Sequence, residues 1–216
     1  MSFGTMAAML GGGMLKSILI YFCTLVGALP LGLLVAFGRM SKNRILSGIV
    51  KVYISIMRGT PLMLQLMVVF FGPFYLLRIS TGTGYRFAAV VIGFVLNYAA
   101  YFAEIYRGGI ESIPVGQYEA AEVLGYTKLQ TFVRIILPQV IKRILPSITN
   151  EVVTLVKDTS MAFTVSYQEM FTIGKQIANS QTSFVPFVVA GVFYYILNFV
   201  VDRVMGRVEK RLDYYQ

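Results

Sequence analysis

Long apolar stretches without charge alternate along this chain with short basic clusters. Five of these stretches can cross a hydrocarbon core of roughly 30 Å as helices of about 20 residues. They are residues 17–37, 61–79, 87–106, 145–165 and 184–201. With 56% hydrophobic and 13% charged residues, the chain has too few charges to cover a soluble domain. The sequence therefore predicts an all-α membrane protein with five transmembrane helices, forming a single domain over residues 1–216.

The basic residues divide unevenly between the connecting segments. The three segments on one side hold five, five and four Lys or Arg residues, which makes fourteen, and the opposite side holds four. Because cytoplasmic loops carry the excess of Lys and Arg, we expect the N-terminus outside and the C-terminus in the cytoplasm. The same rule explains the net charge of +9 without a nucleic-acid partner. The outside segment 167–182 is predicted to contain a short interfacial helix.

Residues able to do chemistry are scarce. The chain has no histidine, and its single cysteine, Cys23, lies within an apolar stretch. A Gly-rich phosphate loop ending in Lys-Ser or Lys-Thr is also missing from the sequence. We therefore expect no metal site, no cofactor and no catalytic activity in this chain.

The predicted cytoplasmic loop, residues 107–142, has a helical pattern of its own. Pro114 and Gly116 break the chain, after which residues 117–124 form a short helix that Gly125 ends as a left-handed cap. A second short helix over residues 128–136 is expected to stop at Leu137–Pro138. The loop should form a compact protrusion with small residues where another protein can approach.

Several motifs in this order resemble one known family. Glu119-Ala120-Ala121, Gly125 and Ile136-Leu137-Pro138 resemble the cytoplasmic "EAA" loop of bacterial ABC importer permeases. Three further stretches resemble the subgroup that imports polar amino acids. They are residues 58–62 with Gln65, residues 103–110, and Asn150-Glu151 followed by residues 157–160. The resemblance covers residues 24–216.

The resemblance implies a set of partners and a mechanism. It implies a multi-pass translocation subunit in the bacterial inner membrane, paired with an identical or related permease and with two ATPase subunits that carry ATP and Mg. An amino-acid-binding protein would dock outside, and transport would proceed by alternating access. The residues implied to couple to the ATPase subunits are Glu119, Ala120, Ala121, Glu122 and Gly125.

Charged residues at membrane depth mark the candidate substrate site, because they are costly there and face a cavity or the protein interior. Glu151 and Asp158 are seven residues apart, so they project from one helix face with Thr154 between them. Asn150 and Lys157 form a neighbouring pair. Two carboxylates would suit a cationic amino acid such as arginine, lysine or histidine, with glutamine or another uncharged polar amino acid as the alternative. The competing interpretation is that these charges only stabilise helix packing.

Other polar and small residues are predicted to line the path, to form an ion pair or to help the helices pack. Asn97 and Glu104 are also seven apart and could face the same path, although Glu104 is expected to pair with Arg107. Gln65 is a possible lining residue. Residues 58–61 are expected to form the entrance of the second span, with substrate contact as the alternative. Gly27 and Gly32 should permit close approach of another helix.

Two other function classes remain open on the sequence alone. An ion-coupled secondary transporter could use Glu151 and Asp158 as ion ligands, although five spans without internal repeats suit it poorly. A scaffold subunit of another membrane complex could also carry a protruding loop. Dependence of uptake on ATP would separate the first from an importer, and a requirement of the chain for transport would separate the second.

Overall fold

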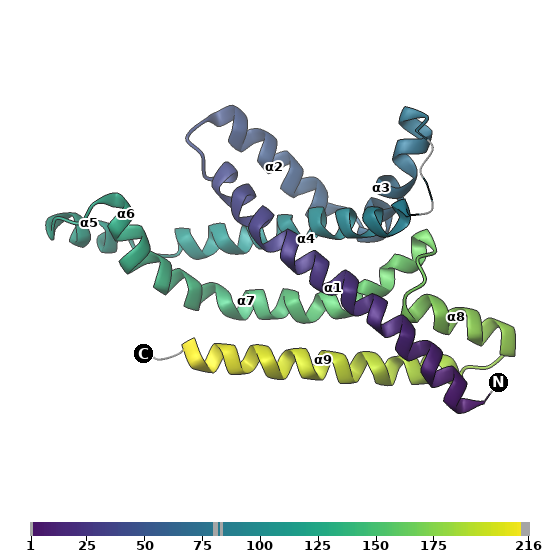
Figure 1. The fold of residues 1–216 in the computed structure, drawn as a ribbon. Helices are drawn as coiled ribbons and strands as arrows, with labels where there is room; N and C mark the ends of the chain where they lie inside the picture. Colours follow the sequence, from purple (N-terminus) through teal and green to yellow (C-terminus); the bar gives the residue numbers. More distant parts are fainter. Residues whose placement is uncertain (1, 80–81, 83, 213–216) are drawn as a thin grey trace.

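The computed structural model describes residues 2–79, 82 and 84–212, and all regular structure in them is helical (Figure 1). Both chain ends, residue 1 and residues 213–216, lie outside the described part. The α-helices are α1 (Phe3–Arg39), α2 (Arg44–Gly59), α3 (Leu62–Leu77), α4 (Tyr85–Glu111), α5 (Val115–Val123), α6 (Lys128–Thr131), α7 (Leu137–Asp158), α8 (Met170–Gln181) and α9 (Val185–Leu212). A π-helical segment, η1 (Phe132–Ile136), precedes α7, and a 3₁₀ segment, η2 (Thr159–Val165), follows it.

The long helices pack around α4, which contacts α1 on one side and α7 on another, while α9 packs on α7. The start of α1 and helix α8 lie at one end of the molecule, whereas α5, α6 and the end of α9 lie at the other (Figure 1). Glycines bring α1 close to α4, as predicted. A Cβ added to Gly27 would lie 2.7 Å from a methyl of Val95, and one added to Gly32 would lie 2.8 Å from Cβ of Phe102.

Three helices in the described chain, α1, α4 and α9, are individually long and apolar enough to cross a membrane. Helices α2 and α3 together could form a fourth span that is bent by 112°. The predicted fourth span, residues 145–165, is divided between α7 and the 3₁₀ segment and carries three charged residues. Helix α1 begins well before the predicted residue 17, and α9 extends well beyond residue 201.

The connection expected between the first two predicted spans is largely helical. Its residues form helix α2, and the chain breaks at Thr60–Pro61 before α3, which coincides with the second predicted span, begins. The break lies beside the middle of α4, because the amide of Asn97 donates to the carbonyl of Met57 at 3.0 Å. Pro61 directly precedes α3, as predicted. Charged residues interrupt the sequence of α2, so its apolar residues do not form the long uncharged stretch by which the other spans were predicted.

The expectation that Pro138 stops a helix was wrong. Helix α6, the π segment and α7 form one uninterrupted helix, with Pro138 in the first turn of α7. A proline has no N–H and its ring clashes with the carbonyl four residues earlier. The wider π turn immediately before it relieves both conflicts locally, which lets the helix continue.

The predicted helix in segment 167–182 is confirmed as α8, and its apolar residues Met170 and Ile177 are buried in a cluster with residues of α1 and α9. Glu169 caps this helix and is fully buried. Its carboxylate accepts hydrogen bonds from the N–H groups of Phe171 and Thr172, each at 2.7 Å, and from the hydroxyl of Tyr194 at 3.2 Å. Burial raises the pKa of Glu169, and these hydrogen bonds act in the opposite direction. Glu169 is not among the residues predicted above from the sequence.

Candidate translocation site

A cavity of about 220 Å³ lies between α4, α7 and the break that separates α2 from α3. Its walls are formed by Thr60, Leu62, Asn97, Tyr98, Tyr101, Glu151, Thr154 and Asp158. The three α7 residues in this list are those predicted to share one helix face. The structure therefore brings Glu151, Thr154 and Asp158 together and adds Asn97 from the predicted stripe on α4.

The two carboxylates of the cavity have different surroundings. Asp158 Oδ2 accepts a hydrogen bond of 2.7 Å from the hydroxyl of Tyr98, whose ring is buried against Phe94 and Phe102. Glu151 is half-buried and makes no hydrogen bond or ion pair with any residue that the structure describes. Asp158 is thus held in place by the protein, whereas the carboxylate oxygens of Glu151 have no hydrogen-bond donor among the described residues.

Gln65 holds the helix break rather than lining the cavity. Its amide nitrogen donates to the carbonyls of Met57 and Thr60, at 2.9 and 3.1 Å, and to the Thr60 hydroxyl at 2.8 Å. Its amide oxygen accepts from Asn97 at 2.9 Å. Because Thr60 and Asn97 are both cavity residues, Gln65 fixes the positions of two polar groups that a ligand would meet.

The loop between α4 and α7 forms the protrusion that the sequence predicts. Gly125 has φ +77° and ends α5, and Tyr126 N–H donates to Ala121 O across it at 3.0 Å. Ala121 is buried, whereas Glu119, Ala120 and Glu122 are exposed. Three large apolar side chains at the tip are strongly exposed, namely Val123 at 88%, Leu124 at 73% and Leu129 at 73%.

The chain matches the family model for the "binding-protein-dependent transport system inner membrane component" over residues 28–214. The chain belongs to this family. It is therefore a multi-pass membrane protein and a transport component, and the exposed loop is the segment whose motifs carried the resemblance.

Known relatives of this permease are similar over most of its length. It is 36% identical over 208 residues to the L-cystine transport system permease protein of Bacillus subtilis, covering 95% of this chain and 87% of that one. It is 38% identical over 186 residues to a putative glutamine transport system permease protein of Rickettsia bellii, covering 85% and 84%. A crystal structure of an amino acid ABC transporter with histidines matches with TM-score 0.87 and 26% identity, covering 98% of this chain and 99% of that one.

Two predicted site residues of the permease lie outside the cavity. Asn150 and Lys157 are exposed, and neither is among the cavity residues. The described residues also contain no group of three or more Cys, Asp or Glu side chains that could hold a metal ion.

The predicted ion pair of Glu104 is confirmed. Arg107 donates to both carboxylate oxygens, with Nε–Oε1 at 3.1 Å and Nη2–Oε2 at 2.7 Å. Arg58 Nη1 approaches the same carboxylate at 3.8 Å, and its guanidinium lies 5.3 Å from the ring centre of Tyr101. Sequence spacing could predict the pair of Glu104 with Arg107, because both residues lie on one helix. It could not predict the contact of Glu104 with Arg58, which lies on α2.

Proposed function

We propose that this permease is the translocation subunit of an ATP-driven importer of polar amino acids, and that the cavity between α4 and α7 holds the substrate. The observation that carries this proposal is the cavity itself, which places two carboxylates beside a broken helix. Transporters commonly bind substrate where spanning helices are discontinuous, because freed backbone and polar side chains meet there. The cystine, glutamine and amino-acid relatives support the substrate class.

Basic amino acids are the substrates that the cavity's charge favours. Its residues include Glu151 and Asp158 and no Lys or Arg among the described lining. A side chain with a positive charge would be attracted by both carboxylates, whereas an acidic one would be repelled. Glutamine remains the alternative, because Thr60, Asn97 and Thr154 offer partners for an amide and a relative is named for glutamine transport.

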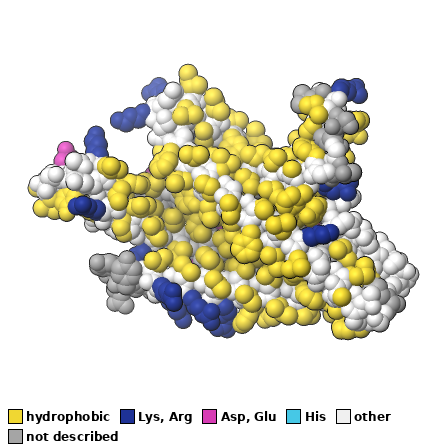
Figure 2. Space-filling view, in the orientation of Figure 1, with side chains coloured by type: hydrophobic (Ala, Val, Ile, Leu, Met, Phe, Trp, Pro, Cys, Tyr) yellow, Lys and Arg dark blue, Asp and Glu magenta, His cyan; other side chains and the backbone are white. Residues whose placement is uncertain are grey.

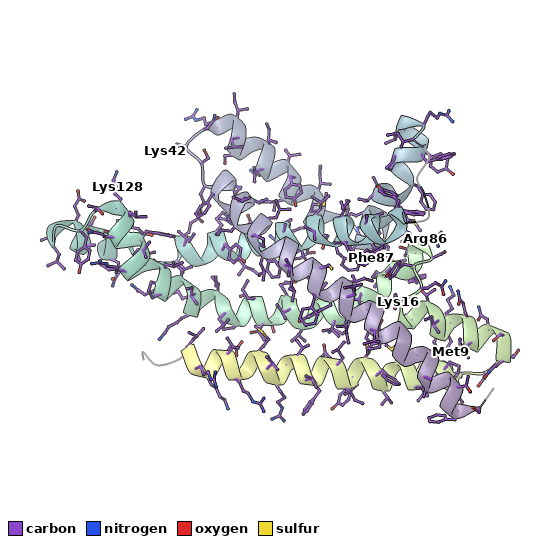
Figure 3. All side chains as sticks on the ribbon, in the orientation of Figure 1. Met9, Lys16, Lys42, Arg86, Phe87 and Lys128 are labelled. Carbon is purple, nitrogen blue, oxygen red and sulfur yellow. The ribbon has the colours of Figure 1, made fainter. Side chains whose placement is uncertain are left out.

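The proposed topology has five spans, with the N-terminus outside and the C-terminus in the cytoplasm. Helices α2 and α3 would form the broken second span, and α7 with its 3₁₀ extension would form the fourth, since its polar face is covered by α4. The charge distribution supports this orientation. Lys42 and Lys128 lie at the end where α5 and α6 protrude, and Met9 lies at the opposite end (Figure 3). Hydrophobic side chains cover most of the face seen in Figure 2, and Lys and Arg gather along the C-terminal half of α9.

Transport would require partners that supply energy and substrate. We expect a second permease subunit, two ATPase subunits that bind ATP and Mg and dock on the α5–α6 protrusion, and an outside amino-acid-binding protein. Nucleotide binding would move the protrusion and rock the helices between outward-open and inward-open states. Coupling requires that the two states differ in affinity for both substrate and nucleotide. The permease itself would catalyse no reaction.

The deciding experiment is ATP-driven uptake of labelled arginine and glutamine by the complete transporter in proteoliposomes with its binding protein. We expect Glu151→Gln and Asp158→Asn each to raise the KM for arginine about tenfold or more, because a charge-assisted hydrogen bond contributes about 1.5–3 kcal/mol. Asp202→Asn, an exposed carboxylate on α9, is the matched control. An unchanged arginine KM in both cavity variants would show that these carboxylates are structural.

A further inference from the structure

A second cavity, of about 520 Å³, lies farther along the same pair of helices. The α4 side contributes Glu104, Gly108 and Ser112, and the α7 side contributes Arg143, Ile144 and Ser147. These residues are at the end of the molecule from which the α5–α6 loop protrudes (Figure 1). The proposed substrate site does not account for this cavity.

The two cavities follow one continuous helix face on each side. On α4, the first cavity ends at Tyr101 and the second begins at Glu104, three residues later. On α7, the first ends at Glu151 and the second begins at Ser147, four residues earlier. Steps of three and four keep side chains on the same face of a helix. The residues therefore outline one path about 20 Å long between α4 and α7, at 1.5 Å per residue from Asp158 to Ile144.

Arg58 sits at the level where the cavities meet. Its guanidinium lies 5.3 Å from the ring centre of Tyr101, a wall of the first cavity, and its Nη1 lies 3.8 Å from Glu104 Oε2, a wall of the second. The residue is two positions before the helix break at Thr60. A change in the angle between α2 and α3 would therefore move this side chain.

We propose that the second cavity is the cytoplasmic half of the substrate path and that Arg58, resting on Tyr101 and Glu104, is the barrier between the halves. This inference rests on the proposed function of the first cavity. The Arg58 contact is the looser of two on Glu104, because Arg107 binds the same carboxylate at 2.7 Å. Every amino acid carries an α-ammonium group, which can replace the Arg58 guanidinium beside Glu104 as the substrate passes.

The barrier is tested by leak from proteoliposomes that contain the complete transporter and are preloaded with labelled arginine, without ATP or binding protein. We expect Arg58→Ala to raise the efflux rate at least tenfold and Tyr101→Leu to raise it also, because each removes one side of the contact. Arg44→Ala, an exposed arginine at the start of the same helix, should leak like wild type. Leak at the wild-type rate in assembled Arg58→Ala and Tyr101→Leu transporters would overturn the proposal.

The role of the second cavity as the cytoplasmic half of the path, by which the substrate leaves, is tested by placing a larger side chain in it. A Cβ at Gly108 would meet no atom within 4 Å, so Gly108→Leu can place its side chain in the second cavity without a backbone clash. We expect ATP-driven uptake to fall at least tenfold while equilibrium arginine binding to the purified transporter is retained. Gly191→Leu on the exposed face of α9, where a Cβ also meets nothing, is the control. Wild-type uptake by Gly108→Leu would refute an exit path through this cavity.

The two proposals fail in different ways. If the wild-type transporter takes up neither arginine nor glutamine, the proposed function fails. If the wild type transports and the Arg58 and Gly108 variants behave identically to it, only the inference about the exit half fails.

Discussion

Two adjacent glycines near the end of α4 should respond to the same substitution in opposite ways. A Cβ added to Gly109 would lie 2.1 Å from Cγ2 of Ile144 and 3.2 Å from Cγ1 of Val140, both on α7. A Cβ added to Gly108 would have no neighbour within 4 Å. The Cγ2 methyl of a β-branched side chain cannot swing away without moving the whole rotamer. Gly109→Ala must therefore push α4 and α7 apart, and Gly108→Ala need not.

The size of the effect follows from the difference between the two variants. Replacing glycine by alanine within a helix stabilises it by about 1 kcal/mol, and this gain is common to both. Overpacking a tight contact costs about 1–3 kcal/mol and applies only to Gly109→Ala. The two variants should therefore differ by about 1–3 kcal/mol, or roughly 2–12 °C in the unfolding midpoint for a chain of this size.

The assay is thermal unfolding of the detergent-purified chain followed by helical circular dichroism, since the chain has no tryptophan to report by fluorescence. We expect the midpoint of Gly109→Ala to lie below that of Gly108→Ala. Adding Ile144→Ala to Gly109→Ala removes the clashing methyl and should recover part of the loss in a double-mutant cycle. Equal midpoints for the two glycine variants would refute the claim that Gly109 sets the spacing of α4 and α7.

Three further substitutions test other parts of the structure. Glu169→Gln should lower the free energy of unfolding by about 1–3 kcal/mol, because an amide cannot accept all the hydrogen bonds that the buried carboxylate receives; the thermal midpoint measures this. Gln65→Leu should cost about 1–3 kcal/mol, because it leaves the carbonyl of Thr60 without its donor and takes one acceptor from Asn97, and it should also lower arginine affinity by disordering the cavity wall. Val123→Asp should abolish binding of the ATPase subunits, measured by co-purification, while leaving the thermal midpoint of the chain unchanged.

Each of these tests has a contrary outcome. A midpoint for Glu169→Gln equal to that of Glu209→Gln, a partly exposed carboxylate on α9, would show that the cap is dispensable. Gln65→Leu with wild-type stability would mean that water replaces its hydrogen bonds. Normal co-purification of Val123→Asp would place the ATPase contact elsewhere than at the tip of α5.

Local spacing was enough to find several features of the site. Glu151, Thr154 and Asp158 could be grouped because positions three and seven apart share a helix face whatever the partner helix is. Gly125 could be placed at a left-handed position because a short helix ends there and glycine adopts this conformation without strain. The Glu104–Arg107 pair could also be predicted from spacing, since both residues lie on one turn of α4.

Features that depend on contacts between distant segments could not be predicted from the sequence. In the sequence, nothing distinguishes Tyr98 from the other aromatic residues of its apolar stretch. Only the packing of α4 on α7 reveals its hydrogen bond to Asp158. Glu169 lies 152 residues from Ser17, one of its contacts on α1. A weak signal for Glu169 did exist, because a lone carboxylate directly before an apolar helix can act as its N-cap.

The helix break at Thr60–Pro61 explains why the polar residues of this permease occur where they do. A break inside a membrane-spanning segment frees backbone carbonyls that lipid cannot satisfy, so it is tolerated only where protein or a water-filled cavity covers it. Gln65 and Asn97 supply hydrogen bonds to the carbonyls of Met57 and Thr60, and Thr60, Leu62 and Asn97 line the cavity beside the break. Thr60 belongs to both the break and the cavity wall. The residues that stabilise the discontinuity thus also position the groups proposed to meet the substrate, and a movement of α2 against α3 would alter the cavity and the Arg58 barrier together.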